Sequence, residues 1–375
     1  MGLTSNSTLA VAVAVAVVLF GLTLWLWPRL ARRGWRALGG RVSLLLATQT
    51  ALICSLAVAA NQTFGFYANW DDLLGRETDQ GVLVDHSATV AASGPLRVVS
   101  VKSPPGGVGS RASTVGQVQK VDIVGRVSRI ATPAYVYLPP EYFQPAFRTR
   151  TFPVSVVLTG YPGTAQALVT KLKYPATARK LAKDGRMRPM ILVMMRPTVA
   201  PPRDTECVDV PKGPQTETFF ARDLPEAVLA HYRAGSRPGG WGIIGDSTGG
   251  YCALKIAMRH PGAYAAGAGL SAYYKAPVDP TTGDLFHGDR NLRDHADLHW
   301  LLAHEPAPDT ALLVTSSKIG EHNYQDTLKF LAEVRATGRT RISSVILDSG
   351  GHNFNTWRRE IPTALQWLSG HLDDR

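Results

Sequence analysis

The apolar residues divide the chain into two regions of different character. Residues 9–27 and residues 42–60 are uncharged and predominantly apolar. Each segment is close to the roughly 20 residues that a helix needs to cross the hydrocarbon core of a bilayer. Aromatic residues flank the two segments, as they do at membrane interfaces: Trp25, Trp27, Trp35, Phe64, Phe66 and Tyr67. The pattern predicts two transmembrane helices that anchor the chain through residues 1–63.

The segment between the apolar stretches predicts their orientation. Residues 28–41 contain no acidic residue and five arginines: Arg29, Arg32, Arg33, Arg36 and Arg41. Short loops rich in Arg and Lys stay on the cytoplasmic side of a membrane. We therefore expect a multi-pass protein of the cell membrane, with everything after residue 60 outside the cytoplasm. A signal peptide is the alternative, but its basic residues would precede the apolar run, and here they follow it.

Beyond about residue 121, short β-type runs alternate with longer helical segments. The apolar runs are continuous, which is typical of parallel strands that are buried on both faces. Strands are predicted at 134–138, 154–159, 190–195, 241–244, 264–270, 311–315 and 342–348, and helices at 165–183, 216–233, 249–260, 324–337 and 354–372. We expect a doubly wound, mostly parallel α/β sheet over residues 128–375. Residues 64–127, with a short strand at 96–101, are expected to form a juxtamembrane segment and linker.

The net charge first points to a different class of protein. The 375 residues carry a net charge of +11, from 40 Lys and Arg against 29 Asp and Glu. Such a balance invites a nucleic-acid-binding interpretation. Five of the positive charges belong to the arginine-rich loop, however, and no basic stripe interleaved with aromatic residues follows it. We therefore expect no nucleic-acid partner.

One motif carries the candidate chemistry. Gly245-Asp-Ser-Thr-Gly249 fits the pattern G-x-S-x-G and stands between a predicted strand and a predicted helix, which is the context of a nucleophile elbow. The turn places Ser247 at a helix N-terminus, where backbone N–H groups stabilise an anion. Ser247 is the predicted nucleophile, and a structural turn serine is the alternative. Chymotrypsin-like proteases carry Gly-Asp-Ser-Gly-Gly on an all-β fold, whereas Thr248 interrupts that motif here.

A serine nucleophile needs a base and an acid, which in this arrangement follow it in the order acid, then histidine. His352 is the predicted base, because it follows the last predicted strand and precedes the last predicted helix. Glu321, six residues beyond the strand at 311–315, is the predicted acid. Its role would be to orient the imidazole and to stabilise the imidazolium. Glu333 and Asp326, on the next predicted helix, are the alternatives.

Two backbone N–H groups are expected to form an oxyanion hole. One belongs to Thr248, the residue after the nucleophile, and the other to the loop after an earlier strand. Gly160-Tyr-Pro-Gly163 follows the strand at 154–159. Pro162 has no N–H, so Tyr161 is the predicted donor. An ordinary turn is the alternative interpretation of this segment.

The cysteines and histidines give weaker signals. Cys207 and Cys252 both lie in the predicted outer domain, where an oxidising compartment permits a disulfide; two separate buried thiols are the alternative. The sequence contains no C-x-x-C, H-E-x-x-H or phosphate-binding loop, so we expect neither a metal nor a cofactor. Four irregularly spaced histidines are interpreted as surface residues: His287, His295, His299 and His304.

Three segments resemble one known family. They are Gly-Asp-Ser-Thr-Gly-Gly-Tyr followed by Ala-Met-Arg-His-Pro-Gly-Ala-Tyr, Glu217-Thr-Phe-Phe-Ala-Arg-Asp-Leu-Pro, and His352-Asn-Phe-Asn-Thr-Trp357. With them, residues 128–372 resemble the putative esterase family of α/β-hydrolases, which includes esterase D-like enzymes and secreted mycolyltransferases. The resemblance implies an α/β-hydrolase fold, with Ser247 as the nucleophile and His352 as the base.

The same resemblance leaves the acid open. Mycolyltransferases place the acid on the helix after the strand, which favours Glu333, whereas the wider family places it on the loop, which favours Glu321. The Asp-Gly-Leu oxyanion segment of the mycolyltransferases corresponds here to Thr159-Gly-Tyr161. The two predicted membrane helices are also unlike the secreted mycolyltransferases.

Together these patterns predict a membrane-anchored extracytoplasmic serine esterase that hydrolyses carboxylic esters through an acyl-enzyme. Its expected partners are an ester or lipid-like small-molecule substrate and the membrane. An acyltransferase that moves an acyl group to an envelope sugar or lipid is the first alternative. A non-catalytic, hydrolase-like envelope protein is the second. Residues 273–302 are the predicted insertion over the site.

Overall fold

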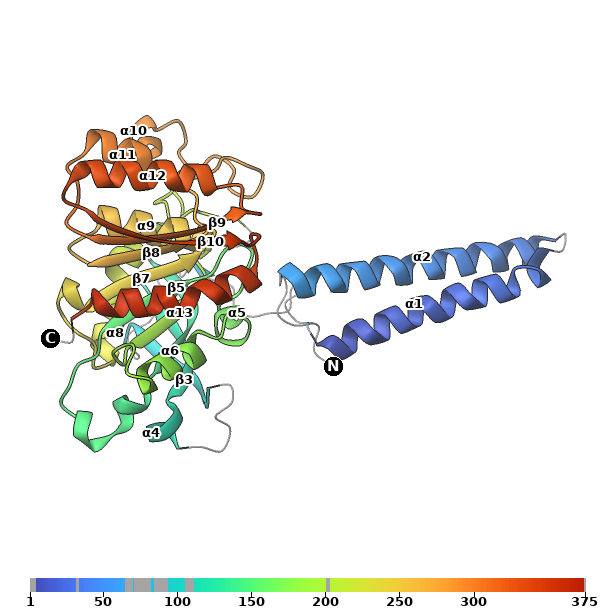
Figure 1. The fold of residues 1–375 in the computed structure, drawn as a ribbon, viewed down its shortest axis with the longest axis horizontal. Helices are drawn as coiled ribbons and strands as arrows, with labels where there is room; N and C mark the ends of the chain where they lie inside the picture. Colours follow the sequence, from blue (N-terminus) through green and yellow to red (C-terminus); the bar gives the residue numbers. More distant parts are fainter. Residues whose placement is uncertain are drawn as a thin grey trace. The chain divides into compact units, whose positions relative to one another are not determined.

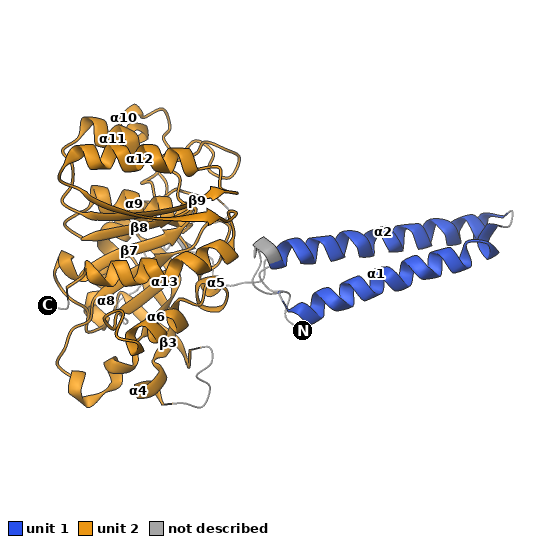
Figure 2. Ribbon diagram, in the orientation of Figure 1, with its two compact units in different colours: residues 1–77 blue, residues 78–375 orange. Residues whose placement is uncertain are grey.

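The computed structural model describes residues 5–31, 34–64, 70, 82–83, 94–104, 111–199 and 203–373. The chain forms two compact units, one of helices and one built around a β-sheet (Figure 1). The first unit is Met1–Glu77 and the second is Thr78–Arg375 (Figure 2).

The first unit is an antiparallel pair of helices, α1 (Asn6–Leu26) and α2 (Trp35–Phe64). The side-chain amide of Gln62 donates to the carbonyl oxygen of Ser5 at 2.8 Å, so the end of α2 lies beside the start of α1. Both helices are long and apolar enough to cross a membrane, and a signal sequence near the N-terminus shares these features. The two predicted apolar segments therefore lie in these two helices.

Helix α2 begins earlier than expected. The segment from Trp35 to Arg41 was predicted as part of a loop, but it forms the first turns of α2. Arginine, alanine and leucine are strong helix formers, so the helix extends back through them. The connection shortens to a 3₁₀ turn, η1 (Arg29–Ala31), and a few flanking residues.

The second unit is built around a ten-stranded sheet with the order β10-β9-β8-β7-β5-β6-β4-β3-β2 and with β1 paired to β4. The strands are β1 (Val82–Leu83), β2 (Leu96–Lys102), β3 (Gln117–Val124), β4 (Ile130–Leu138), β5 (Val154–Leu158), β6 (Ile191–Met195), β7 (Trp241–Asp246), β8 (Ala266–Leu270), β9 (Ala311–Ile319) and β10 (Arg341–Ser349). The neighbours from β10 to β6 are parallel, and β4, β3 and β2 join as antiparallel strands. The predicted mostly parallel α/β sheet is confirmed.

Successive residues of the central strands pack into two different core clusters. Ile191 and Val193 of β6 belong to one cluster, and Leu192 and Met194 belong to the other. Because side chains alternate across a strand, the two clusters lie on opposite faces of the sheet. The helices α8 (Leu224–His231), α9 (Thr248–Arg259) and α12 (Tyr324–Thr337) pack into the first cluster, and α5 (Ala165–Thr170), α6 (Tyr174–Lys183) and α13 (Phe354–Gly370) into the second. This is the two-sided covering that continuous apolar strands predict.

The helices of the second unit are mostly short. They are α4 (Ala112–Val115), α5 (Ala165–Thr170), α6 (Tyr174–Lys183), α7 (Thr216–Thr218), α8 (Leu224–His231), α9 (Thr248–Arg259), α10 (Arg290–Asp294), α11 (Leu298–His304), α12 (Tyr324–Thr337) and α13 (Phe354–Gly370). The single helix predicted at 165–183 is two helices, because Lys173 has a φ of +57° and Pro175 lies in the first turn of α6, where a proline is tolerated. The helix predicted at 216–233 contains a π-helical turn at Phe219–Asp223, just before Pro225.

The predicted linker contributes to the sheet. Strands β2 and β3 pair with each other, and β3 pairs with β4, so this unit includes residues ahead of the expected start at 128. Leu96, Val121 and Ile123 are buried in the core, and the strand predicted at 96–101 is present as β2. The linker residues 65–69, 71–81, 84–93 and 105–110 lie outside the described residues.

Candidate active site

Ser247 sits in the sharp turn between β7 and α9, at the carboxyl edge of the parallel strands. Its backbone has φ +53° and ψ −122°, a strained conformation for a residue with a side chain. The flanking glycines make the turn sterically feasible. A Cβ on Gly245 would overlap the carbonyl group of Gly249, and a Cβ on Gly249 would overlap the carbonyl oxygen of Leu158.

His352 comes from the loop that follows β10. Its Nε2 lies 2.8 Å from Oγ of Ser247, although the two residues are 105 positions apart in the sequence. The imidazole meets the ring of Trp357 edge to face, with the ring centroids 5.2 Å apart. The side chain is 47% exposed, so the histidine is accessible from solvent. The structure thus brings the predicted nucleophile and the predicted base into hydrogen-bonding contact.

Glu321 lies behind His352, on the loop that follows β9. Its Oε1 is 3.9 Å from Nδ1 of His352, and its side chain is buried. The same oxygen accepts a hydrogen bond from Oγ of Ser271 at 2.6 Å. Oγ of Ser271 in turn accepts a hydrogen bond from the indole N–H of Trp357 at 2.9 Å. The carboxylate is therefore held by the residue that follows β8, and that residue is in turn held by Trp357 of α13.

The alternative acids lie elsewhere. Oε2 of Glu333, on α12, is 2.5 Å from Nδ1 of His299, and Asp326 is exposed in the first turn of the same helix. Of the three acids considered, Glu321 is the one that forms an ion-pair contact with His352 in the described part of the chain.

The loop after β5 lies against the nucleophile. A Cβ on Gly160 would be 2.8 Å from Cβ of Ser247. The N–H of Gly160 donates to Oδ2 of Asp246 at 2.9 Å, so it is already engaged, and Tyr161 supplies the next N–H along the loop. Burial raises the pKa of Asp246 to about 7, opposed by the hydrogen bond from Gly160 and by His352. Thr248, the other predicted donor, is the first residue of α9.

Sequence reasoning assigned no role to three residues at this site: Asp246, Ser271 and Trp357. Ser271 directly follows β8 and has a φ of +48°, which marks a constrained position at the carboxyl edge of the sheet. Trp357 ends the segment from His352 to Trp357 that resembles the mycolyltransferases. Its spacing from His352 was therefore the feature of the sequence that could have identified it.

The two cysteines predicted to pair, and three of the four histidines interpreted as surface residues, contact partners of their own. Cys207 and Cys252 form a disulfide that joins the loop before α7 to α9. His295 contacts Glu305, His299 contacts Glu333, and Nδ1 of His304 contacts the carbonyl oxygen of Trp300. Among the residues that the structure describes, no group of three potential metal ligands comes together.

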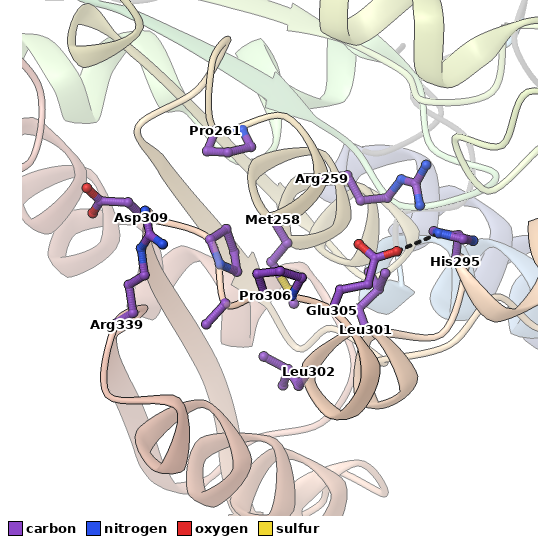
Figure 3. A pocket seen from close by; sticks show the side chains of 12 residues that line it. Met258, Arg259, Pro261, His295, Leu301, Leu302, Glu305, Pro306, Asp309 and Arg339 are labelled. Atoms are coloured by element: carbon purple, nitrogen blue, oxygen red, sulfur yellow. Dashed lines mark hydrogen bonds and ion pairs between the residues drawn. The ribbon is translucent and has the colours of Figure 1, made fainter.

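A cavity of about 630 Å³ lies away from Ser247 (Figure 3). It is lined by Met258 and Arg259 at the end of α9, by Leu301 and Leu302 of α11, and by the loop that leads into β9. These positions are at the amino end of the parallel strands, opposite the edge that carries Ser247. The ion pair between His295 and Glu305 borders it (Figure 3).

A serine on a strand-to-helix elbow, in contact with a histidine that follows the last strand of a mostly parallel sheet, defines the α/β-hydrolase class of serine enzymes. The chain belongs to the putative esterase family, whose model matches residues 130–368. The predicted resemblance is confirmed, and membership places the chain among serine hydrolases and acyltransferases.

Comparison with known proteins shows the same fold. A ferulic acid esterase aligns with a TM-score of 0.58 at 18% identity, over 68% of this chain and 98% of that one. The S-formylglutathione hydrolase of Agrobacterium tumefaciens aligns with a TM-score of 0.56 at 17% identity, over 74% of this chain and 99% of that one. An uncharacterized protein of Corynebacterium glutamicum is 25% identical over 251 residues, which are 64% of this chain and 57% of the relative. The chain thus spans a little over half the length of this curated relative.

Proposed function

We propose that the protein is a membrane-anchored serine esterase that hydrolyses carboxylic esters outside the cytoplasm. The observation that carries the proposal is the contact of 2.8 Å between Nε2 of His352 and Oγ of Ser247. The nucleophile is presented on a strained elbow at the N-terminus of α9, and both features are those of an activated serine rather than of a turn serine.

The reaction follows from this geometry. Oγ of Ser247 attacks the ester carbonyl while Nε2 of His352 takes the hydroxyl proton. The backbone N–H groups of Thr248 and Tyr161 stabilise the tetrahedral oxyanion. The intermediate collapses, the imidazolium gives its proton to the leaving alcohol, and an acyl-enzyme remains on Ser247. Water then attacks the acyl-enzyme with His352 again as the base, which releases the acid and restores the serine.

Glu321 is the proposed acid of the triad. Its carboxylate would orient the imidazole and stabilise the positive charge that His352 gains in the transition state. The separation of 3.9 Å from Nδ1 is longer than a hydrogen bond. Catalytic hydrogen bonds are often long in the absence of substrate and shorten in the reacting complex.

Two observations support a location outside the cytoplasm. The connection between α1 and α2 is rich in arginine and contains no acid, as cytoplasmic loops are. The second unit carries the disulfide between Cys207 and Cys252, and disulfides persist in oxidising compartments. In this topology α1 and α2 span the membrane and the catalytic unit faces outward.

An acyltransferase is the second candidate. It shares every step up to the acyl-enzyme and differs only in the group that accepts the acyl chain. The segment from His352 to Trp357 favours it, because this spacing resembles that of the mycolyltransferases, and Trp357 contacts both His352 and Ser271. Product analysis with and without envelope sugars or lipids as acceptors separates the two activities.

Labelling by a fluorophosphonate probe tests the shared chemistry. The purified full chain in detergent should be labelled, and Ser247→Ala should abolish both labelling and hydrolysis of p-nitrophenyl butyrate. Ser236→Ala is the matched control, because Ser236 is exposed on a surface loop and its loss should change neither signal. Equal labelling of wild type and Ser247→Ala would contradict the assignment of the nucleophile.

A further inference from the structure

The net positive charge of the second unit is concentrated on one face of its sheet. Of the 40 Lys and Arg and the 29 Asp and Glu of the chain, 34 and 26 lie in residues 78–375, which gives this unit a net charge of +8. Nine of its basic residues lie in or next to α6 and α13, which cover that face side by side (Figure 1). They form what we call the basic face: Lys171, Lys173, Arg179, Lys180, Lys183, Arg186, Arg188, Arg358 and Arg359.

Acids do not balance this face. All nine basic side chains are exposed or partly exposed, and the exposed acid in residues 171–188 and 354–370 is Asp184. Nine positive charges and one negative charge equal the net charge of the whole unit. In the described part of the chain, one of the nine pairs with an acid, since Nζ of Lys180 lies 2.8 Å from Oδ2 of Asp184. Arg186 instead donates to the neutral amide of Gln366, which links α6 to α13 and leaves the charge in place.

Basic residues from different elements are also held near each other. Lys171 precedes α6 and Arg358 belongs to α13. Burial, and then the charge of Arg358, lower the pKa of Lys171. Like charges that are held close together repel and weaken the compact state. An anionic surface placed against the basic face would relieve this repulsion.

The opposite face of the sheet has no such excess of charge. Helix α12, which packs there, alternates the sign of its charges through Asp326, Lys329, Glu333 and Arg335. Outside the basic face and Asp184, the second unit contains as many acidic as basic residues. The positive charge is therefore a property of one face and not of the composition of the whole unit.

The basic face offers charge without exposed aromatic or apolar groups. Tyr174 and Trp357 are buried, and the half-buried Trp367 donates its indole N–H to Ser343. Proteins that bind single-stranded nucleic acid add exposed aromatic side chains on which the bases stack. The large apolar residues of α6 and α13 are buried as well. A broad surface of phosphate groups, without bases to stack, fits these features.

We propose that the basic face docks the second unit on the anionic surface of the membrane that holds α1 and α2. This inference rests on the proposed function, in which α1 and α2 anchor the chain in a bilayer. Lys and Arg clusters are attracted to anionic lipid headgroups within about one Debye length. The anchor makes the contact intramolecular, so a modest attraction is sufficient.

Docking by this face would also orient the active site. Helix α13 begins two residues after His352, and Arg359 donates to the carbonyl oxygen of Ser349 in the strand that leads to His352. The basic face therefore borders the loop that carries the catalytic base. Contact with the membrane would hold the edge of the sheet with Ser247 and His352 close to the lipid headgroups.

Quenching by lipid headgroups tests the docking. The full chain is placed in nanodiscs of neutral lipid, with or without phosphatidylglycerol, that contain a lipid with a nitroxide headgroup. A fluorophore is attached to Thr363→Cys on α13 or, as the matched control, to Ala336→Cys on α12, both exposed positions, with Cys54→Ala removing the free thiol. In anionic discs we expect quenching at Thr363→Cys to be about fivefold stronger than at Ala336→Cys. The two should be equal in neutral discs and in 1 M NaCl, where the Debye length is about 3 Å.

Charge reversal tests whether the basic face causes this contact. Lys183→Glu with Arg186→Glu should reduce quenching at the α13 label to the level of the α12 label. Lys329→Glu with Arg335→Glu changes the net charge of the chain equally on the opposite face and should leave the difference intact. All four side chains are exposed, and melting temperatures verify folding. Equal quenching of the two labels in anionic discs, or a difference that survives reversal on α6, would overturn the proposal.

Retention in the discs distinguishes failure of docking from failure of the anchor. Co-purification with neutral discs in 1 M NaCl reports insertion of α1 and α2 and requires neither docking nor catalysis. A chain that is lost from these discs would refute the anchor and the docking with it; a chain that stays but shows no selective quenching would refute the docking alone. Binding to immobilised polyphosphate that depends on Lys183 and Arg186, without selective quenching, would assign the face to a soluble polyanion and overturn the docking.

Discussion

At the scale of single residues, Glu321 depends on two neighbours outside the triad. Ser271 donates to its carboxylate and Trp357 donates to Ser271, so the orientation of the acid is set by three different loops or helices. Oε2 of Glu321 has no hydrogen-bond partner in the described part of the chain. The carboxylate therefore retains acceptor capacity for a shorter contact with His352 once the histidine is charged.

Exchange of the acid for its amide tests this assignment. Glu321→Gln should lower kcat for p-nitrophenyl butyrate by about a thousandfold, because an amide does not stabilise the imidazolium and favours the wrong tautomer. Glu333→Gln is the matched control, since Glu333 is paired with His299, and its kcat should stay within about twofold. A larger loss in Glu333→Gln than in Glu321→Gln would transfer the role of the acid to α12.

The residues that sequence reasoning found are those whose signal is local. Ser247 lies in a motif between a strand and a helix, and His352 follows the last strand. Ser271 has no such motif. Its contacts with Glu321 and Trp357 arise because the carboxyl ends of the parallel strands bring separate loops to one edge, and the sequence pattern does not state which side chains of those loops meet.

At the scale of elements, the loop after β5 is closely packed against the turn that carries the nucleophile. Gly160 packs against Ser247, and its N–H is held by Asp246. These two contacts fix the backbone just before Tyr161, the proposed oxyanion donor. The loop therefore couples the position of the donor to the position of the nucleophile.

An added methyl group should separate the loop from the elbow. In Gly160→Ala the new Cβ would lie 2.8 Å from Cβ of Ser247 and 3.2 Å from the carbonyl oxygen of Asp246. We expect kcat to fall by about a hundredfold, the effect of losing one oxyanion donor. Gly262→Ala is the control, because its Cβ would meet nothing within 4 Å. Kinetics and melting temperature are measured together; an unchanged kcat in Gly160→Ala would remove the loop from the oxyanion hole.

The tertiary structure explains why two elements were predicted wrongly. Residues 165–183 have a continuous helical pattern, but Lys173 takes a left-handed conformation and a new helix begins at Tyr174, with Pro175 in its first turn. Strand β3 lies in the region that the sequence pattern assigned to a linker. It is a strand because its antiparallel partner β4 and the core cover it, which only the folded arrangement supplies.

At the scale of the whole molecule, the two units differ in the surfaces that they present. The outer sides of α1 and α2 expose large apolar residues, such as Val17 at 64% and Leu56 at 71%. The second unit instead buries most of its large apolar residues in two core clusters. Apolar surface of this extent is stable in lipid rather than in water, which supports the proposed anchoring of the first unit.

The proposed topology predicts opposite labelling of two exposed positions. A single cysteine is introduced at Ala31, between the helices, or at Ala336, on the surface of α12, with Cys54→Ala removing the free thiol. Both substitutions leave every arginine of the connection in place, so the determinants of orientation are unchanged. A membrane-impermeant maleimide should label Ala336→Cys in intact spheroplasts and Ala31→Cys only after the membrane is permeabilised. The reverse pattern would place the catalytic unit in the cytoplasm, and labelling of both positions in intact spheroplasts would show that α1 and α2 do not form a spanning pair.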